Sequence, residues 1–208
     1  PFAEWVIDGD FPAGRPNWES AGVTFSSDIH SHERRKLWLL NGSHSLLAYV
    51  GLVRGCETVA EAMCDSYCAE TAQLWWNDAL TVLDGDEASL RSYTEALRAR
   101  FANPRIQYQL AQIGTDGSLK IPVRWIPGLQ MLREAGVMPV AIVRGLAAYT
   151  LYLHGDDIRD ARRDALIGAV AHTPSATFRA VLELLAPALL DDAELLAAVD
   201  AQLEAFAA

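Results

Sequence analysis

From about Ser31 to its end, the chain is rich in alanine and leucine, and glycine and proline stand mostly between its apolar segments. Apolar segments separated in this way favour helices that pack on one another. The segments predicted as helices, with approximate ends, are 31–54, 58–63, 66–83, 87–101, 106–113, 123–135, 139–154, 157–172, 175–187 and 191–207. The sequence therefore predicts an all-α, multi-helix domain. Trp75-Trp76 falls within one of these helices, where we expect one core and one surface residue rather than a platform that stacks on a sugar.

Residues 1–29 have a different composition. Trp5-Val-Ile7 and Val23-Thr-Phe25 are short β-prone runs, and turn-prone glycines and prolines lie between them. We therefore divide the chain into a short β-containing lead-in at 1–29 and a helical domain at 30–208. We expect Ser31 to cap the first helix.

The first predicted helix contains three well-spaced polar residues in the run Lys36-Leu-Trp-Leu-Leu-Asn41-Gly-Ser-His44. On one α-helix, Lys36, Asn41 and His44 point at roughly 0°, 140° and 80°, so one cleft can contact all three. An amine can take up a proton, an amide can hold an oxyanion and an imidazole can orient a hydroxyl. The alternative is a structural helix in which the lysine reaches solvent and the other two side chains bond to neighbouring groups.

Charge and cysteine content argue against several other functions. A net charge of −10 argues against nucleic acid or an anionic membrane surface as partner. No apolar run reaches the roughly 18 residues that cross a bilayer. Three cysteines, an odd number, indicate a reducing compartment, so we expect a cytoplasmic protein. Cys56, Cys64 and Cys68 have no histidine at zinc-like spacing, so we predict buried free thiols and no metal site.

The Lys36-x4-Asn41-x2-His44 spacing resembles the catalytic signature of the mannitol dehydrogenase family, the polyol-specific long-chain dehydrogenases. The segments Glu57-Thr-Val-Ala-Glu-Ala-Met63, Phe101-Ala-Asn-Pro104 and Asp116-Gly-Ser-Leu-Lys120-Ile-Pro122 resemble that family too, and the resemblance extends over essentially the whole chain. It implies a C-terminal domain like that of 6-phosphogluconate dehydrogenase, preceded by an N-terminal Rossmann domain that binds NAD or NADP.

The sequence contains no Gly-x-Gly-x-x-Gly, the glycine-rich turn with which a Rossmann domain holds a dinucleotide. We therefore expect most of the cofactor-binding half to lie outside these 208 residues, and the 208 residues alone to be inactive.

The resemblance implies a role for each residue of the signature. Lys36 would be the general base that takes the alcohol proton, a task that a zinc ion would otherwise assist. Asn41 would stabilise the charge that develops on the substrate oxygen. His44 would orient the substrate.

A second set of residues would contact the substrate. Lys120 aligns with a substrate-binding lysine of the family. Gln112 stands where mannitol-type enzymes have an arginine, and this departure resembles the mannonate oxidoreductase branch. Arg124 resembles that branch too, where a second cation could hold the carboxylate of a sugar acid. The alternative for this set is a solvated turn between helices.

We therefore expect the catalytic half of a metal-independent, NAD(P)-dependent dehydrogenase. Its substrate pair would be a hexitol and a ketose, such as mannitol and fructose, or an aldonate and a keto-uronate, such as mannonate and fructuronate. The partners would be this small molecule and the Rossmann domain of the same enzyme. The competing interpretation is a non-catalytic helical interaction domain that keeps only the scaffold.

Overall fold

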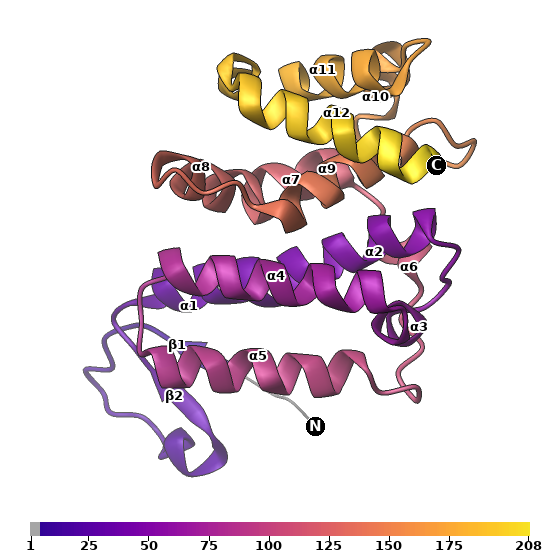
Figure 1. The fold of residues 1–208 in the computed structure, drawn as a ribbon. Helices are drawn as coiled ribbons and strands as arrows, with labels where there is room; N and C mark the ends of the chain where they lie inside the picture. Colours follow the sequence, from indigo (N-terminus) through magenta and orange to yellow (C-terminus); the bar gives the residue numbers. More distant parts are fainter. Residues whose placement is uncertain (1–4) are drawn as a thin grey trace.

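The computed structural model describes residues 5–208, most of which form helices (Figure 1). The lead-in contains strand β1 (Trp5–Ile7), the 3-10 helix η1 (Trp18–Ala21) and strand β2 (Val23–Phe25). The elements that follow are α1 (Ile29–Arg35), the π-helix η2 (Lys36–Gly42), α2 (Ser43–Val53), α3 (Val59–Cys64), α4 (Ser66–Val82), α5 (Glu87–Phe101), α6 (Leu110–Ile113), α7 (Gly117–Arg124), α8 (Ile126–Glu134), α9 (Val140–Tyr152), α10 (Arg163–Ala169), α11 (Pro174–Leu185), the 3-10 helix η3 (Pro187–Asp191) and α12 (Ala193–Ala207). The prediction of an all-α fold with a short β-containing lead-in is confirmed.

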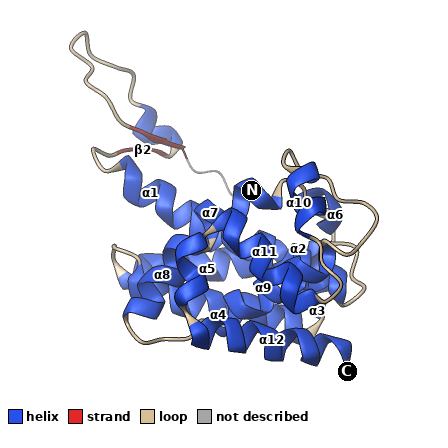
Figure 2. Cartoon of the chain, turned by 90° about the horizontal axis from the view of Figure 1, so that it is seen from above, coloured by secondary structure: helices blue, strands red, loops and turns tan. Residues whose placement is uncertain are grey.

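The two strands of the lead-in are parallel, and Trp5 pairs with Val23 while Ile7 pairs with Phe25. Trp18 stacks on Trp5 and on Phe25, at ring centroid distances of 6.3 and 6.2 Å. Figure 2 shows this lead-in extending away from the helical body. Residues 1–4 of the predicted lead-in lie outside the described part of the chain, and the domain boundary at residue 30 stays a prediction.

Polar side chains cap the N-terminal ends of several helices. Thr58 and Glu61 form a reciprocal capping box at the start of α3. Pro174 is the first residue of α11, as its fixed φ favours. The prediction for Ser31 is wrong, because Asp28 caps α1 and its carboxylate accepts a hydrogen bond from the Ser31 backbone N–H at 3.2 Å. A carboxylate is a stronger acceptor than a hydroxyl for the exposed N–H groups of a first turn.

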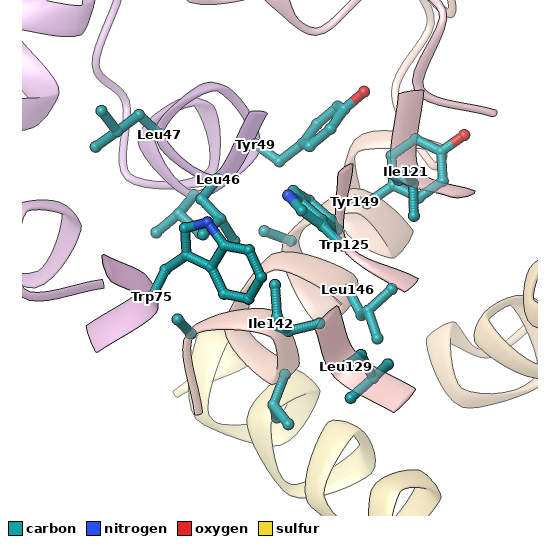
Figure 3. Close-up of a cluster of buried hydrophobic side chains, with 14 of the residues drawn as sticks. Leu46, Leu47, Tyr49, Trp75, Ile121, Trp125, Leu129, Ile142, Leu146 and Tyr149 are labelled. Carbon is teal, nitrogen blue, oxygen red and sulfur yellow. The ribbon is translucent and has the colours of Figure 1, made fainter. Parts of the chain in front are cut away.

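The core lies where α2 meets α9 and α4. Figure 1 shows α7, α8 and α9 between α2 and α4 on one side and α10, α11 and α12 on the other. A Cβ on Gly145 of α9 would lie 2.5 Å from Leu46 Cδ2 of α2, so these two helices are too close for any side chain there. Figure 3 shows Leu46, Ile142 and Leu146 in this interface, together with Trp75 and Trp125.

Three predicted segments differ from the structure. The helix expected at 106–113 is only the short α6, and the helix expected at 157–172 is only α10. No helix was predicted for the segment after Asp116, which forms the helix α7 with Pro122 inside it. α7 stops at Trp125, whose φ of −120° breaks the helical path before α8.

Candidate active site

The Lys36–Gly42 segment is a π-helix between α1 and α2, whereas the sequence predicted one continuous α-helix. Hydrogen bonds in a π-helix join residues five apart, so each residue returns close to the residue five positions before it. Lys36 and Asn41 are five residues apart and therefore share a side of the helix, instead of pointing roughly 140° apart. His44 follows Asn41 by three residues, in the first turn of α2, which keeps it on the same side.

Five consecutive carbonyl groups of this segment accept hydrogen bonds from side chains. The bonds run from Trp75 Nε1 to Trp38 O (2.7 Å), from Trp76 Nε1 to Leu39 O (2.9 Å), from Ser43 Oγ to Leu40 O (3.1 Å), from Arg124 Nη1 to Asn41 O (3.2 Å) and from Trp125 Nε1 to Gly42 O (3.0 Å). The three donating tryptophans are at most 1% exposed. Both Trp75 and Trp76 are in the core, so the expectation of one core and one surface residue is wrong, and their use as hydrogen-bond donors was missed.

Gly42 allows these donors to approach. A Cβ on Gly42 would lie 2.9 Å from Trp75 Nε1 and 3.3 Å from the backbone oxygen of Arg124. The neighbouring helices therefore come closer to the π-helix at this point than a side chain would permit.

His44 lies in an aromatic and cationic environment. Its ring stacks on Phe101 at a centroid distance of 4.3 Å and meets the Tyr108 ring edge-on at 5.8 Å. Burial, followed by the charges of Arg100 and Arg124, lowers the pKa of His44 to about 4, so the imidazole is neutral at neutral pH. Its Nε2 atom is buried and bonds to none of residues 5–208.

Lys36 lies at the edge of the helical body, and its side chain is exposed. It lines a hollow of about 230 Å³ between β1 and α1, together with Trp5, Val6, Ile29, His32 and Glu33. The side that it shares with Asn41 is therefore open toward the lead-in.

The predicted substrate residues Gln112 and Lys120 flank the turn between α6 and α7. Gln112 is exposed. The Lys120 ammonium donates to the backbone oxygens of Ile113 and Thr115, at 3.1 and 2.5 Å, and so ties the turn together. Burial, followed by the charge of Arg124, lowers the pKa of Lys120.

This turn is anchored from three directions. Tyr49 OH donates to the carbonyl of Gly114 at 2.8 Å, and the Asp160 carboxylate accepts hydrogen bonds from the N–H and hydroxyl of Ser118, at 2.8 and 2.5 Å. Asp116 has a left-handed backbone, with φ of 54°, and its carboxylate accepts from the N–H of Ala161 at 3.0 Å. Gln112 and Lys120 are thus on an ordered corner of the fold.

Arg124 joins the two sets of predicted residues. Besides the Asn41 carbonyl, its Nη1 donates to the Ser45 hydroxyl at 2.9 Å. Its Nη2 and Nε bond to no other residue that the structure describes. Asn41, His44, Lys120 and Arg124 are therefore brought together, whereas Gln112 and Lys36 contact none of them through a side-chain hydrogen bond within residues 5–208.

Sequence reasoning missed Arg100 and Tyr108 beside His44. Arg100 directly precedes the Phe101-Ala-Asn-Pro104 segment, so the position of that segment was the available signal. The cysteine prediction is wrong for one thiol, because Cys64 ends α3 and is exposed, while Cys56 is half-buried and Cys68 is buried. In residues 5–208, His, Cys, Asp and Glu side chains form no group of three or more that could hold a metal ion.

None of the helices described in residues 5–208 has the length and apolar character needed to cross a membrane.

Comparison with known proteins shows the family to which the chain belongs. Residues 28–206 match the model of the mannitol dehydrogenase C-terminal domain. The chain is 34% identical over 183 residues to the uncharacterised oxidoreductase YeiQ of Escherichia coli, covering 84% of this chain and 38% of that protein. It is 35% identical over 159 residues to D-mannonate oxidoreductase of the same species, covering 76% of this chain and 33% of that protein.

The fold is similar to that of Pseudomonas fluorescens mannitol 2-dehydrogenase, whose structure is a ternary complex with NAD and D-mannitol. The TM-score is 0.86 at 32% identity, covering 98% of this chain and 44% of that chain. The chain thus spans 33% to 38% of the length of the two curated relatives named above. By sequence and by fold, the chain belongs to the mannitol dehydrogenase family and corresponds to its C-terminal domain.

Proposed function

We propose that this chain is the substrate-binding and proton-transferring domain of an NAD(P)-dependent dehydrogenase that acts on a hexitol or a hexonate without a metal ion. One observation supports the proposal: Lys36 and Asn41 lie five residues apart in a π-helix, a spacing that favours one side, and His44 follows in the first turn of α2. The named relatives support it: a D-mannonate oxidoreductase, and a mannitol 2-dehydrogenase whose structure is a ternary complex with NAD and D-mannitol.

Each residue has a separate task in this proposal. The Lys36 amine takes the proton from the substrate hydroxyl as the alcohol is oxidised, and returns it in the reverse direction. The Asn41 amide donates a hydrogen bond to the same oxygen, where negative charge develops. His44, neutral at neutral pH, orients a neighbouring hydroxyl through Nε2.

The residues of this chain fit a polyol better than they fit a dinucleotide. β1 and β2 are parallel, but the segment between them contains η1 and no Gly-x-Gly-x-x-Gly sequence, so the described residues do not form the usual pyrophosphate cradle. Nicotinamide chemistry, the exchange of a hydride with the substrate carbon, would be supplied by a separate domain. The 208 residues alone are therefore expected to show no turnover.

Replacement of Lys36 tests the proposal directly. In the complete enzyme, Lys36→Ala should lower the rate of polyol oxidation by about 10²- to 10⁴-fold, which is the usual contribution of a general base. Added primary amines should restore part of the rate, because they replace the missing base. Steady-state kinetics with and without ethylamine measures both effects.

Arg34→Ala is the matched control. Arg34 is an exposed cation on the neighbouring α1, paired with Asp84 at 3.4 Å, and its loss should leave the rate within about twofold, as for a surface pair. A Lys36→Ala enzyme with near-normal rates would assign the proton transfer to another group. A wild-type enzyme that oxidises no polyol or aldonate would favour the alternative, a helical interaction domain without chemistry.

The charges near His44 favour a substrate with a carboxylate. After burial, the charges of Arg100 and Arg124 lower the pKa of His44, and after burial the charge of Arg124 lowers that of Lys120, so positive charge gathers around the proposed site. Asp116 and Asp160 offset part of this charge at Lys120. We therefore propose the aldonate and keto-uronate pair, such as mannonate and fructuronate, ahead of the hexitol and ketose pair.

The ratio of kcat/KM for fructuronate to kcat/KM for fructose tests the substrate class. We expect wild-type enzyme to prefer fructuronate, and Arg124→Gln to lower the ratio about ten- to hundredfold through loss of a charge-assisted hydrogen bond. If Arg124→Gln lowers both rates equally, Arg124 acts only by holding the Asn41 carbonyl. A wild-type preference for fructose would identify the hexitol as substrate.

A further inference from the structure

The donors that bind the π-helix come from both sides of it. Trp75 and Trp76 lie on α4, whereas Trp125 lies in the break between α7 and α8. The donors and the acceptors are separated by 37 residues along the chain for α4 and by 83 for Trp125. The π-helix is therefore held by two elements that are distant in sequence.

A π-helix needs such support. It is rare on its own and occurs mostly as a single turn inserted in an α-helix, because its wide turn is less favourable than the α-helical one. A buried carbonyl without a donor is costly, and the wide turn lets carbonyls tilt toward neighbouring groups. An indole N–H suits this position because it donates and cannot accept, and because its large ring is fixed by packing.

We propose that Trp75, Trp76 and Trp125 are positioning residues, whose N–H groups hold the π-helix and thereby keep Lys36 and Asn41 on one side. The inference rests on the proposed function of Lys36 and Asn41. In an α-helical turn the two side chains point roughly 140° apart, which is farther from a shared oxygen than the five-residue spacing of a π-helix places them. The tryptophans touch neither the substrate nor the reacting atoms.

Trp125 also links the end of α7 to the π-helix. Trp125 directly follows Arg124, and these two residues donate to adjacent carbonyls of the π-helix, those of Asn41 and Gly42. The C-terminal end of α7 is thus fixed against the segment that carries Asn41. Lys120 lies on the same helix, α7. The indole of Trp125 therefore sets the distance between the proposed base and the proposed substrate contacts.

The test removes the N–H groups and keeps the rings. Trp75→Phe and Trp125→Phe are made singly in the complete enzyme, and Trp125 is also replaced by benzothienylalanine, which has the same two-ring shape without an N–H. Phe178→Leu is the control. Phe178 is buried in α11, and its replacement removes packing contacts from a part of the core away from the π-helix. Three quantities are measured: kcat and KM for the preferred substrate, the midpoint of thermal unfolding, and deuterium exchange of the peptide that spans residues 36–46.

We expect kcat to fall at least tenfold in the tryptophan variants, with KM changed less than threefold and exchange in residues 36–46 faster than in wild type. Phe178→Leu should lower the unfolding midpoint and leave kcat and this exchange unchanged. If Trp125→Phe does not fold, the benzothienylalanine variant, which keeps the packing, decides. Wild-type kcat in that variant, or exchange at the wild-type rate, overturns the inference.

The two proposals fail in different ways. If wild-type enzyme oxidises no polyol or aldonate, the proposed function is wrong, and exchange in residues 36–46 still shows whether the indole N–H groups hold the π-helix. If wild-type enzyme is active and Lys36→Ala abolishes the rate while the tryptophan variants keep it, the proposed function stands and the positioning role is wrong.

Discussion

At the scale of the residue, His44 shows how burial decides what a side chain can do. Its pKa is lowered to about 4, mainly by burial and then by Arg100 and Arg124, so the ring stays neutral. Its buried Nε2 has no partner in residues 5–208, and an unsatisfied buried polar atom costs free energy until a ligand or water bonds to it. A substrate hydroxyl can supply that bond.

The lowered pKa of His44 predicts how the free energy of unfolding depends on pH. The unfolded chain binds a proton to His44 below about pH 6.5, and the folded chain does so only near pH 4, so stability is fully present above pH 6.5 and falls as the pH drops toward 4. From pH 7 to pH 4.5 this residue should remove roughly 2 kcal/mol. Urea unfolding curves of wild type and His44→Gln measure the difference.

His172→Gln is the control for this experiment, since His172 is exposed and its replacement should leave the wild-type pH dependence unchanged. If His44→Gln loses as much stability as wild type over the same pH range, the imidazole is not held neutral in the fold.

At the scale of the elements, η2 packs directly against both α4 and the end of α7. Gly42 allows a close approach between them, because the space that a side chain would occupy is filled by Trp75 and by the backbone of Arg124. Gly117 at the start of α7 is equally confined, since a Cβ there would lie 2.6 Å from Tyr149 Cε2. The glycines of the signature segment and of α7 are thus required by packing.

Gly42→Ala should therefore destabilise the fold, by about 1–3 kcal/mol, since the new methyl group forces Trp75 or the Arg124 backbone to move. Gly168→Ala in α10 is the matched control, because nothing lies within 4 Å of the added Cβ, and it should stabilise the helix by about 0.5–1 kcal/mol. Urea unfolding of both variants provides the test. Equal effects of the two substitutions would mean that the contacts at Gly42 are not rigid.

At the scale of the whole molecule, the buried core and the exposed edge beside the lead-in hold different residues of the proposed site. The core between α2, α4 and α9 fixes Asn41, His44 and the tryptophans, whereas Lys36 faces the hollow beside the lead-in. The proposed base therefore lies at an accessible edge of the helical body, where a second domain of the complete enzyme could contribute to the proposed site.

We expect the activity of the complete enzyme to resist chelators. The described residues provide no group of three metal-binding side chains, and the proposed base is an amine. The complete enzyme, dialysed against EDTA, should keep its rate within about twofold of the untreated enzyme. Loss of activity with EDTA, restored by zinc, would show that a metal ion handles the proton and that Lys36 does not.

The sequence by itself determined the helical fold, most helix boundaries and the positions of Lys36, Asn41 and His44. These features depend on local patterns: apolar periodicity, caps such as Thr58 with Glu61, and a fixed spacing in a single segment. The short helices at 106–113 and 157–172 were predicted too long, since a weak local preference gives way to loop contacts such as those of Asp160 with Ser118.

Only the tertiary structure decided that the signature segment is a π-helix. Its geometry depends on hydrogen bonds to side chains 37 to 83 residues away, those of Trp75, Trp76, Arg124 and Trp125. The sequence of the segment itself does not reveal such distant partners. The same holds for the neutral state of His44, which follows from burial and from two arginines on α5 and α7. The sequence shows where Lys36, Asn41 and His44 lie along the chain. The packing around the π-helix determines how these three residues are arranged in space.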